Sequence, residues 1–229
     1  MRVVSRLMLC GVMALAAAGC GGSDPGTGSR TLWVKAEAVT DGSTDGTELF
    51  IQVRQGGETG EILTDAVVTI EGDKTGEFAV PWTGIKWGDF AAGGYLRDDF
   101  AWDTGWRISV KRGSDDLVAY IEAPGVTEIG KPLANTTYRR SDAQPLVVQW
   151  RDTEGRRAEL VEVDFQESNE ADRTLNEDPG ELEIEYNRLE AKNDERLEVR
   201  RRNEINLEGG VVGSTFRATT RHTIRFNIE

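Results

Sequence analysis

The stretch TFRATTRHTIRFNI, residues 215–228, decides the fold class of this chain. Small or apolar side chains alternate along it with polar ones, and its arginines share the opposite parity. An alternation with a period of two places one set of side chains on each face of an extended strand. The sequence therefore predicts one long C-terminal strand. Its inward positions are Phe216, Ala218, Thr220, His222, Ile224, Phe226 and Ile228.

The same alternation recurs in short runs from residue 31 onward, separated by Gly and Asp residues that are typical of turns. No window of 11 or more residues in this half shows an apolar helical stripe bounded by caps. Short strands with such turns favour a sandwich, so we expect residues 31–125 to form one Ig-like β-sandwich. The runs lie at 32–38, 49–53, 66–70, 106–110 and 118–120.

A second set of runs follows a polar stretch that contains Pro132 and ends before Pro145. We interpret residues 126–144 as a linker and residues 145–229 as a second Ig- or fibronectin-III-like β-sandwich. The predicted fold class is all-β, with two tandem antiparallel β-sandwich (Ig-like) domains after a signal helix and a flexible linker. The runs of the second half lie at 146–150, 161–165, 181–186, 197–199, 205–207 and 216–228.

Two segments resemble known modules of exported bacterial proteins. Residues 60–72, GEILTDAVVTIEG, are similar to the core motif of Ig-like and carboxypeptidase-regulatory-like modules. Residues 145–229 resemble the second, fibronectin-III-like module of two-domain envelope lipoproteins. Both resemblances imply a fold and not an activity.

The N-terminal segment indicates where the protein is located. Arg2 and Arg6 precede an uncharged run of 12 residues, 7–18. That length suits the core of a signal peptide and is too short for a membrane-spanning helix. Ala17-Ala18-Gly19-Cys20 resembles the lipobox of bacterial lipoproteins, which implies cleavage after residue 19 and fatty acylation, such as palmitate, at Cys20. An ordinary secretory signal cut after Ala18 is the alternative.

The lipobox interpretation assigns residues 1–19 to the signal peptide and residues 20–30, rich in Gly and Ser, to a flexible tether. Gly21 after the lipobox cysteine resembles outer-membrane sorting. We therefore expect an exported protein, periplasmic or surface exposed, held on the cell envelope by its N-terminal lipid, in the outer membrane of a Gram-negative bacterium.

Composition excludes several function classes. The formal net charge of −13 opposes binding to nucleic acid or to anionic headgroups, so membrane contact would depend on the lipid. Both cysteines, Cys10 and Cys20, lie in the leader and at the lipidation site. The mature body therefore has no disulfide, no cysteine metal site and no cysteine nucleophile.

Catalytic signatures are missing as well. His222 is the sole histidine and has the apolar parity of the last strand, which favours a hydrogen-bonded structural imidazole. No GxSxG elbow, phosphate-binding loop or dinucleotide fingerprint occurs. The sequence leaves open a catalytic pair of carboxylates, because acidic residues are abundant and no particular pair of them stands out. We expect no enzyme, no cofactor and no metal site, but a non-catalytic structural or protein-interaction role in the envelope.

The alternative function is a ligand-binding module for glycan or calcium. Residues 80–106 interleave aromatic rings with carboxylates, which suits sugar stacking and hydroxyl binding, although the same rings suit core packing. Exposure of at least two of the tryptophans would favour binding. The candidate ligand residues are Trp82, Trp87, Asp98, Asp99, Trp102 and Asp103. A calcium loop at Asp41 and Asp45 competes with a simple turn.

Charged positions on the strands allow two interpretations. Arg217, Arg221 and Arg225 lie on the outward parity of the last strand, and the three outward glutamates of residues 181–185 line another. If the two strands are neighbours, cross-strand ion pairs form. If they are not, an acidic ribbon and a basic stripe face a partner. We interpret residues 200–202, three consecutive arginines, as a solvated strand end.

Overall fold

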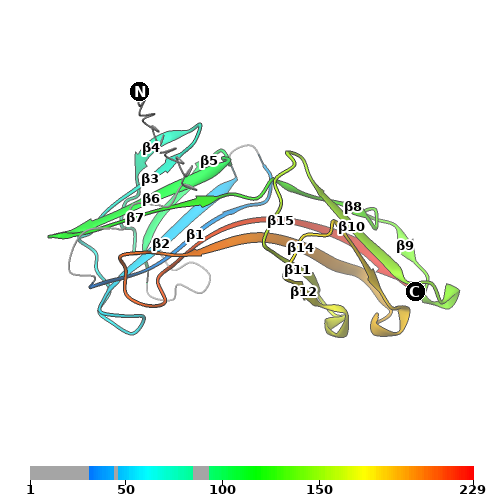
Figure 1. The fold of residues 1–229 in the computed structure, drawn as a ribbon. Coiled ribbons are helices and arrows are strands. Elements are labelled where there is room, and N and C mark those ends of the chain that lie inside the picture. Colours follow the sequence, from blue (N-terminus) through cyan, green and yellow to red (C-terminus); the bar gives the residue numbers. More distant parts are fainter. Residues whose placement is uncertain (1–30, 44–45, 85–92) are drawn as a thin grey trace, which may run out of the picture.

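The computed structural model describes residues 31–43, 46–84 and 93–229, and these residues confirm an all-β chain (Figure 1). The signal, Cys20 and the tether lie outside the described residues. The described residues include three short 3-10 helices, at Arg140–Asp142, Asn169–Ala171 and Tyr186–Arg188. Within the described ranges, none of the helices could span a lipid bilayer.

Fifteen strands are present in the described ranges. In the first half they are β1 Leu32–Thr40, β2 Thr47–Gln55, β3 Val67–Gly72, β4 Gly76–Ala79, β5 Tyr95–Phe100, β6 Gly105–Arg112 and β7 Asp115–Glu122. In the second half they are β8 Thr127–Lys131, β9 Thr137–Tyr138, β10 Leu146–Asp152, β11 Leu160–Phe165, β12 Arg173–Leu175, β13 Glu181–Ile184, β14 Lys192–Asn206 and β15 Thr215–Ile228.

The described strands form three sheets, and the largest runs through both halves of the molecule (Figure 1). Its eight strands have the order β12-β11-β14-β15-β1-β2-β5, with β9 paired to the end of β15. The smaller sheets have the orders β4-β3-β6-β7 and β13-β10-β8. Both β1 and β9 pair with β15 in parallel, so the expectation of purely antiparallel sheets is wrong for the long sheet.

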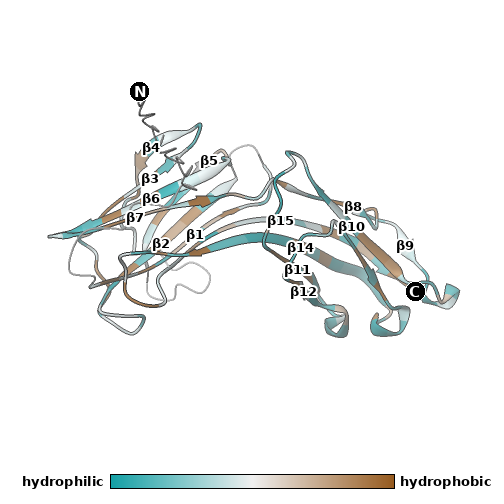
Figure 2. Cartoon of the chain, in the orientation of Figure 1, coloured by the Kyte–Doolittle hydropathy of each residue, from teal (hydrophilic) through white to brown (hydrophobic). Residues whose placement is uncertain are grey.

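Two hydrophobic cores lie between the long sheet and the smaller sheets. The first core contains inward residues of β1, β2, β3, β6 and β7 together with Phe216 and Ala218 of β15. The second contains inward residues of β10, β11 and β14 together with Ile224 and Phe226 of β15. Figure 2 shows apolar residues on strands of both halves. Each core obeys the parity that the sequence predicts.

The long strands β14 and β15 cross from one core to the other, so the two halves share a sheet. The 126–144 segment, expected to be a linker, contains β8, β9 and a 3-10 helix. Alternation did not reveal these strands. Strand β8 is only five residues long and presents just Thr127 and Ile129 to the interior. Such a short run does not stand out against polar neighbours.

Candidate functional site

The described tryptophans of the candidate ligand region belong to the first core. Trp82 is half-buried, with its ring edge-to-face on Tyr95 at 5.4 Å between centroids. Trp102 is half-buried, lies 6.0 Å from the Trp106 ring, and donates its indole N–H to the carbonyl of Pro124 at 2.9 Å. Trp87 lies outside the described residues. The two described rings therefore do not form an exposed stacking platform.

Asp103 acts as a turn cap. Its side chain is buried, with Oδ2 accepting from the backbone N–H groups of Lys74 at 2.8 Å and Thr75 at 2.9 Å, and Oδ1 from that of Thr104 at 2.7 Å. Burial by itself would raise the pKa of this carboxyl, but these hydrogen bonds outweigh burial and hold the pKa below its ordinary value. The backbone donors occupy the oxygens that a sugar hydroxyl would need.

The other two acids of the candidate region lie on β5. Asp98 is exposed, and the side chain of Asp99 is not among those that the structure describes. Glycan binding by the six residues of this region thus stays a prediction that the described side chains do not support.

The Asp41 loop is a turn as far as it is described. Asp41 Oδ1 accepts from the backbone N–H of Ser43 at 3.0 Å and from its hydroxyl at 2.7 Å. The backbone hydrogen bond contributes most to lowering the pKa of Asp41. Asp45 lies outside the described residues. Over the described ranges, no group of three or more His, Cys, Asp or Glu side chains could hold a metal ion.

His222 is a structural residue, as its parity predicts. Its half-buried imidazole accepts, at Nδ1, a hydrogen bond of 3.1 Å from the backbone N–H of Ile129. This bond ties β15 to β8 of the facing sheet. The sole histidine is therefore engaged in holding the second half together.

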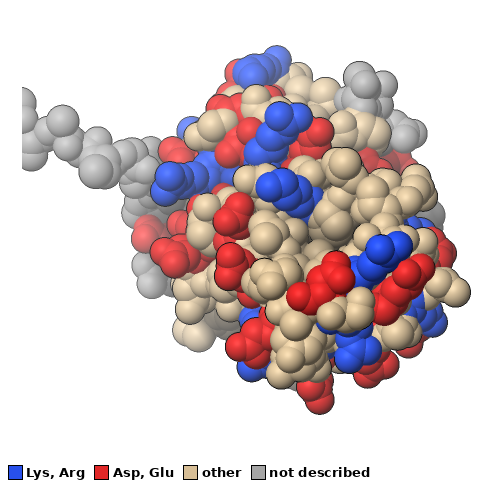
Figure 3. All heavy atoms as spheres, turned by 90° about the vertical axis from the view of Figure 1, so that its right-hand side faces the viewer, with Lys and Arg blue, Asp and Glu red and all other residues tan. Residues whose placement is uncertain are grey.

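The hypothesis that the 181–185 strand neighbours the last strand is wrong. Strand β13 pairs with β10 in a smaller sheet. Arg217 instead pairs with Glu204 at 2.6 Å, and Arg225 with Asp194 at 2.7 Å. Figure 3 shows basic and acidic side chains interspersed over the end of the second half. Neither a single acidic ribbon nor a single basic stripe dominates that end.

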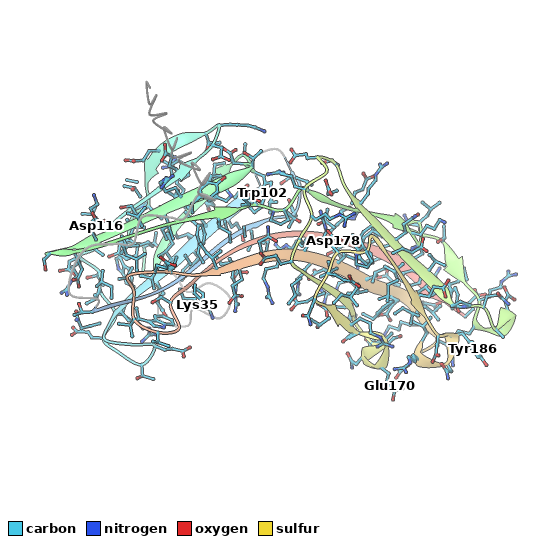
Figure 4. The ribbon with its side chains drawn as sticks, in the orientation of Figure 1. Lys35, Trp102, Asp116, Glu170, Asp178 and Tyr186 are labelled. Carbon is cyan, nitrogen blue, oxygen red and sulfur yellow. The ribbon has the colours of Figure 1, made fainter. Side chains whose placement is uncertain are left out.

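Arg201 is the main departure from the sequence-based interpretation. Residues 200–202 lie inside β14, not at a strand end, and Arg201 is only 1% exposed. Its guanidinium Nε donates to Asp178 Oδ2 at 2.8 Å, while one terminal nitrogen also reaches Asp152 Oδ2 at 3.3 Å. We call Arg201, Asp152 and Asp178 the junction clamp; it lies where the two cores meet (Figure 4).

The two terminal nitrogens of Arg201 also bind backbone carbonyls. They reach Gly125, at the end of the first half, and Arg156, in the β10–β11 loop, at 2.8 and 2.7 Å. Asp178 also accepts from the Trp150 indole at 2.8 Å and from the Ala158 N–H at 3.1 Å. A buried charge is tolerated only when paired and fully hydrogen-bonded, and the junction clamp meets that requirement.

The electrostatics of Asp178 follow from these contacts. Burial favours the neutral acid and would raise the pKa of its carboxyl. The hydrogen bonds from Arg201 and Trp150 to the carboxylate outweigh burial, so the pKa lies below its ordinary value. Asp178 is therefore ionised at neutral pH and balances the guanidinium.

A cleft opens beside the junction clamp. It has a volume of about 520 Å³ and brings together residues of both halves. Asp73 lies in it and accepts hydrogen bonds from the Thr104 hydroxyl at 2.6 Å and the Tyr120 hydroxyl at 3.1 Å. Burial and this bond to Asp73 raise the pKa of Tyr120. The cleft is lined by Asp73, Thr104, Tyr120, Glu122, Ala123, Gly155, Arg156, Arg157 and Asn203.

The lining of the cleft mixes both signs of charge with hydroxyl, amide and aromatic groups. Such a surface can hydrogen-bond a polar chain without any group arranged as a nucleophile and its base. Sequence reasoning missed this cleft and the junction clamp, because their members are dispersed along the chain. One signal was available: three consecutive arginines in a strand must place the middle one on the opposite face.

Comparison with known proteins assigns no family. No family model and no curated protein matches the chain. Among solved structures, the Yersinia pseudotuberculosis adhesin InvE is similar at 12% identity and a TM-score of 0.22, over 90% of this chain and 62% of that one. The chain thus spans less than two thirds of the adhesin chain. A likeness of this degree carries no argument about function.

Proposed function

We propose that this chain is a lipid-anchored lipoprotein of the bacterial cell envelope with a non-catalytic role in structure or protein contact. The observation that carries the proposal is the motif Ala17-Ala18-Gly19-Cys20 after a charged and apolar leader. Acyl chains on Cys20 would hold the protein on a membrane, since two or more chains anchor stably.

The body suits a rigid projection. We interpret each half as an Ig-like sandwich, and the two are joined by β14 and β15 and by the buried junction clamp. Two strands that run unbroken through both halves resist hinge motion, because bending would break ladder hydrogen bonds on each side. A rigid, elongated body favours a spacer or contact role over a mechanism that requires closure around a ligand.

The position of the tether gives the body an orientation. The Thr31 carbonyl accepts a hydrogen bond from Gly56 N–H at 2.7 Å, and that of Leu32 accepts one from Val211 N–H at 2.8 Å. These contacts fix the start of β1 at the end of the first half that is remote from the second core. Residues 20–30 can span at most about 36–40 Å. The first half would therefore lie near the membrane, with the second half projecting away.

The test is substitution of the lipidation residue. Cys20→Ser should abolish fatty-acid labelling and either release the protein from the membrane fraction or leave the uncleaved precursor. Cys10→Ser is the matched control, since it changes the other cysteine without touching the motif. Unchanged labelling and fractionation of Cys20→Ser would refute lipid anchoring at this residue.

A further inference from the structure

The loop between β14 and β15 carries the most exposed large apolar side chain of the described residues. Val212 is 97% exposed, so it contributes almost nothing to either core. Exposed turns are usually built from Gly, Pro, Asn, Asp or Ser, and a β-branched apolar residue at the corner of a turn has no role in forming it. The loop has the sequence LEGGVVGS, residues 207–214, and we call it the valine loop.

Hydrogen bonds hold the valine loop in one shape. Leu207 N–H donates to the Ser214 carbonyl at 2.9 Å, and Ser214 N–H donates to the Val211 carbonyl at 3.0 Å. The Ser214 hydroxyl adds a bond of 2.7 Å to the same Val211 carbonyl. Gly213 has a φ of +87°, which glycine adopts without strain. Val212 therefore occupies the corner of a closed turn and projects into solvent.

The valine loop lies beside the point where the tether joins the body. Val211 N–H donates to the Leu32 carbonyl at 2.8 Å, and the Ser214 hydroxyl accepts from Val34 N–H at 3.1 Å. Strand β1 begins at Leu32, directly after the tether and Thr31. Figure 1 shows the loop and the start of β1 at the same end of the first half. A membrane that holds Cys20 is therefore within reach of this loop, because residues 20–30 span at most about 36–40 Å.

The exposed large apolar side chains of the described residues lie at the two ends of the molecule. Val67 is 62% exposed and pairs with Lys111 near the β6–β7 turn, at the end where the tether joins. Leu133 and Tyr186, 65% and 41% exposed, lie in the second half, and Figure 4 labels Tyr186 at the end remote from the start of β1. The tether distinguishes the two ends, because it holds the first one near a lipid surface.

Charge at the tether end indicates which kind of lipid surface fits. Arg112 pairs with Asp65 at 2.8 Å and Lys111 with Asp116 at 3.4 Å, so these two acids are balanced locally. Glu208, the acid of the valine loop, is exposed. Its carboxylate and the formal net charge of −13 oppose anionic headgroups but not zwitterionic ones.

We propose that the valine loop inserts Val212 into the interface of a zwitterionic bilayer, as a second membrane contact next to the acylated tether. The inference rests on the proposed anchoring at Cys20. Burial of one valine side chain shifts an equilibrium by roughly tenfold, which is too weak to recruit a free protein. On a tethered body the contact is intramolecular, and a short flexible linker supplies an effective concentration of about millimolar. The loop then fixes how the first half is oriented on the membrane.

The test uses the mature lipoprotein in phosphatidylcholine vesicles, and flotation of the vesicles measures anchoring. The mature chain has no free thiol, since Cys10 is removed with the signal and Cys20 carries the lipid. Glu208→Cys therefore places a single reactive thiol on the valine loop and leaves Val212 in place. Leu133→Cys is the matched site at the far end. Each thiol carries an environment-sensitive fluorophore, and its quenching by nitroxide groups on the acyl chains reports contact with lipid.

We expect quenching of the fluorophore at position 208 and none at position 133. Adding Val212→Ser to Glu208→Cys should lower the ratio of membrane-bound to free loop roughly tenfold, because the apolar contact is lost. Val212→Leu is the matched variant and should keep the quenching. Vesicles that contain phosphatidylglycerol should weaken it. The side chain of Val212 is exposed, so all variants should fold, and equal urea midpoints check this.

Four results would overturn the proposal. These are an unquenched fluorophore at position 208 on protein that floats with the vesicles, quenching at position 133 instead, unchanged quenching in Val212→Ser, and stronger quenching on phosphatidylglycerol vesicles. The last would assign the contact to charge. Loss of flotation would refute the anchor at Cys20 and the loop contact with it, so flotation distinguishes failure of the anchor from failure of the loop alone.

Discussion

Replacing Arg201 with Met should destabilise the protein far more than any other single arginine substitution on β14. The side chain is 1% exposed and its charge is balanced by Asp178, whose side chain is 5% exposed, and by Asp152 at 13%. Met keeps most of the volume but removes the positive charge that balances two carboxylates and the guanidinium N–H groups that bind two carbonyls. Removing one partner of a buried ion pair costs about 3–5 kcal/mol of unfolding free energy.

The control is Arg202→Met on the next residue of the strand. Arg202 pairs with Glu162 at 3.4 Å, and both side chains are more than 20% exposed. A pair that water still reaches contributes about 0–1 kcal/mol. The two substitutions have the same chemistry and neighbouring positions, so their difference isolates the effect of burial.

The assay is urea unfolding followed by far-ultraviolet circular dichroism, with hydrogen exchange to locate the weakened strands. A second comparison adds Asp178→Asn to Arg201→Met. The double variant should recover part of the lost stability, because an uncompensated carboxylate dominates the cost. Protection should fall first in β8 and β10, which meet the junction clamp from the smaller sheet of the second half.

A loss of unfolding free energy below about 1 kcal/mol in Arg201→Met, equal to that of an exposed pair, would contradict a buried and coupled ion pair. Such a pair would also be contradicted if adding Asp178→Asn made Arg201→Met still less stable. Either result would mean that water enters the junction and that the two cores are not coupled through this charge.

Three further predictions concern the interior. Folding lowers the pKa of Asp103, so the stabilisation of the fold by its carboxylate is present above the ordinary pKa of about 3.9 and is lost as the pH falls through the folded value. Asp103→Asn should therefore lower the urea midpoint at pH 7 and reduce the dependence of that midpoint on acid. An unchanged midpoint would contradict the turn-cap role. Burial raises the pKa of Glu37, so lowering the pH from 7 towards the folded pKa increases the stability of the wild type. Glu37→Gln should lack this increase. The same pH profile of stability in wild type and Glu37→Gln would contradict the raised pKa. Trp106→Ala should cost about 3–5 kcal/mol in the same unfolding assay, since the ring is fully buried in the first core; a loss under about 1 kcal/mol would mean that the core collapses around the site.

The junction also has a consequence for how the halves behave as a unit. Arg201 binds the Gly125 carbonyl, and Thr220 donates to the same oxygen at 3.1 Å. Thr220 Oγ1 also lies 2.7 Å from Thr127 Oγ1 across the sheets. These polar contacts fill the gap between the two apolar cores. They therefore add directional contacts between the halves, whereas apolar packing is not directional.

Local pattern was sufficient for the strands with a clear alternation and for the face each of them buries. It missed the strands β4, β5, β8, β9 and β12, and it gave the single strand β14 as two runs, 197–199 and 205–207. The 215–228 strand is observed at Thr215–Ile228, and Phe216, Ala218, Ile224, Phe226 and Ile228 are buried as its alternation predicts. Burial of one face of a pleated strand is a property of neighbouring residues, so it is readable without knowing what the strand packs against.

Several residues with outward parity are nevertheless buried. Phe50 of β2 is fully buried because Gly94 comes so close that an added Cβ would lie 2.4 Å from its ring. Gln52 lies beneath the same segment and donates to the Gly93 carbonyl at 3.2 Å. A segment that folds over the outer face of a sheet leaves no periodic signal in the strand that it covers.

The sequence by itself determined the all-β class, the strands with a clear alternation and their inward parity, because these depend on neighbours a few residues apart. Only the tertiary structure decided that β15 serves two cores, that β1 joins it in parallel, and that Arg201 meets Asp152 and Asp178. Those contacts join residues 23 to 180 positions apart. Alternation is identical whichever core a strand faces, so the pairing of distant strands is set by packing and hydrogen bonding that no local pattern encodes.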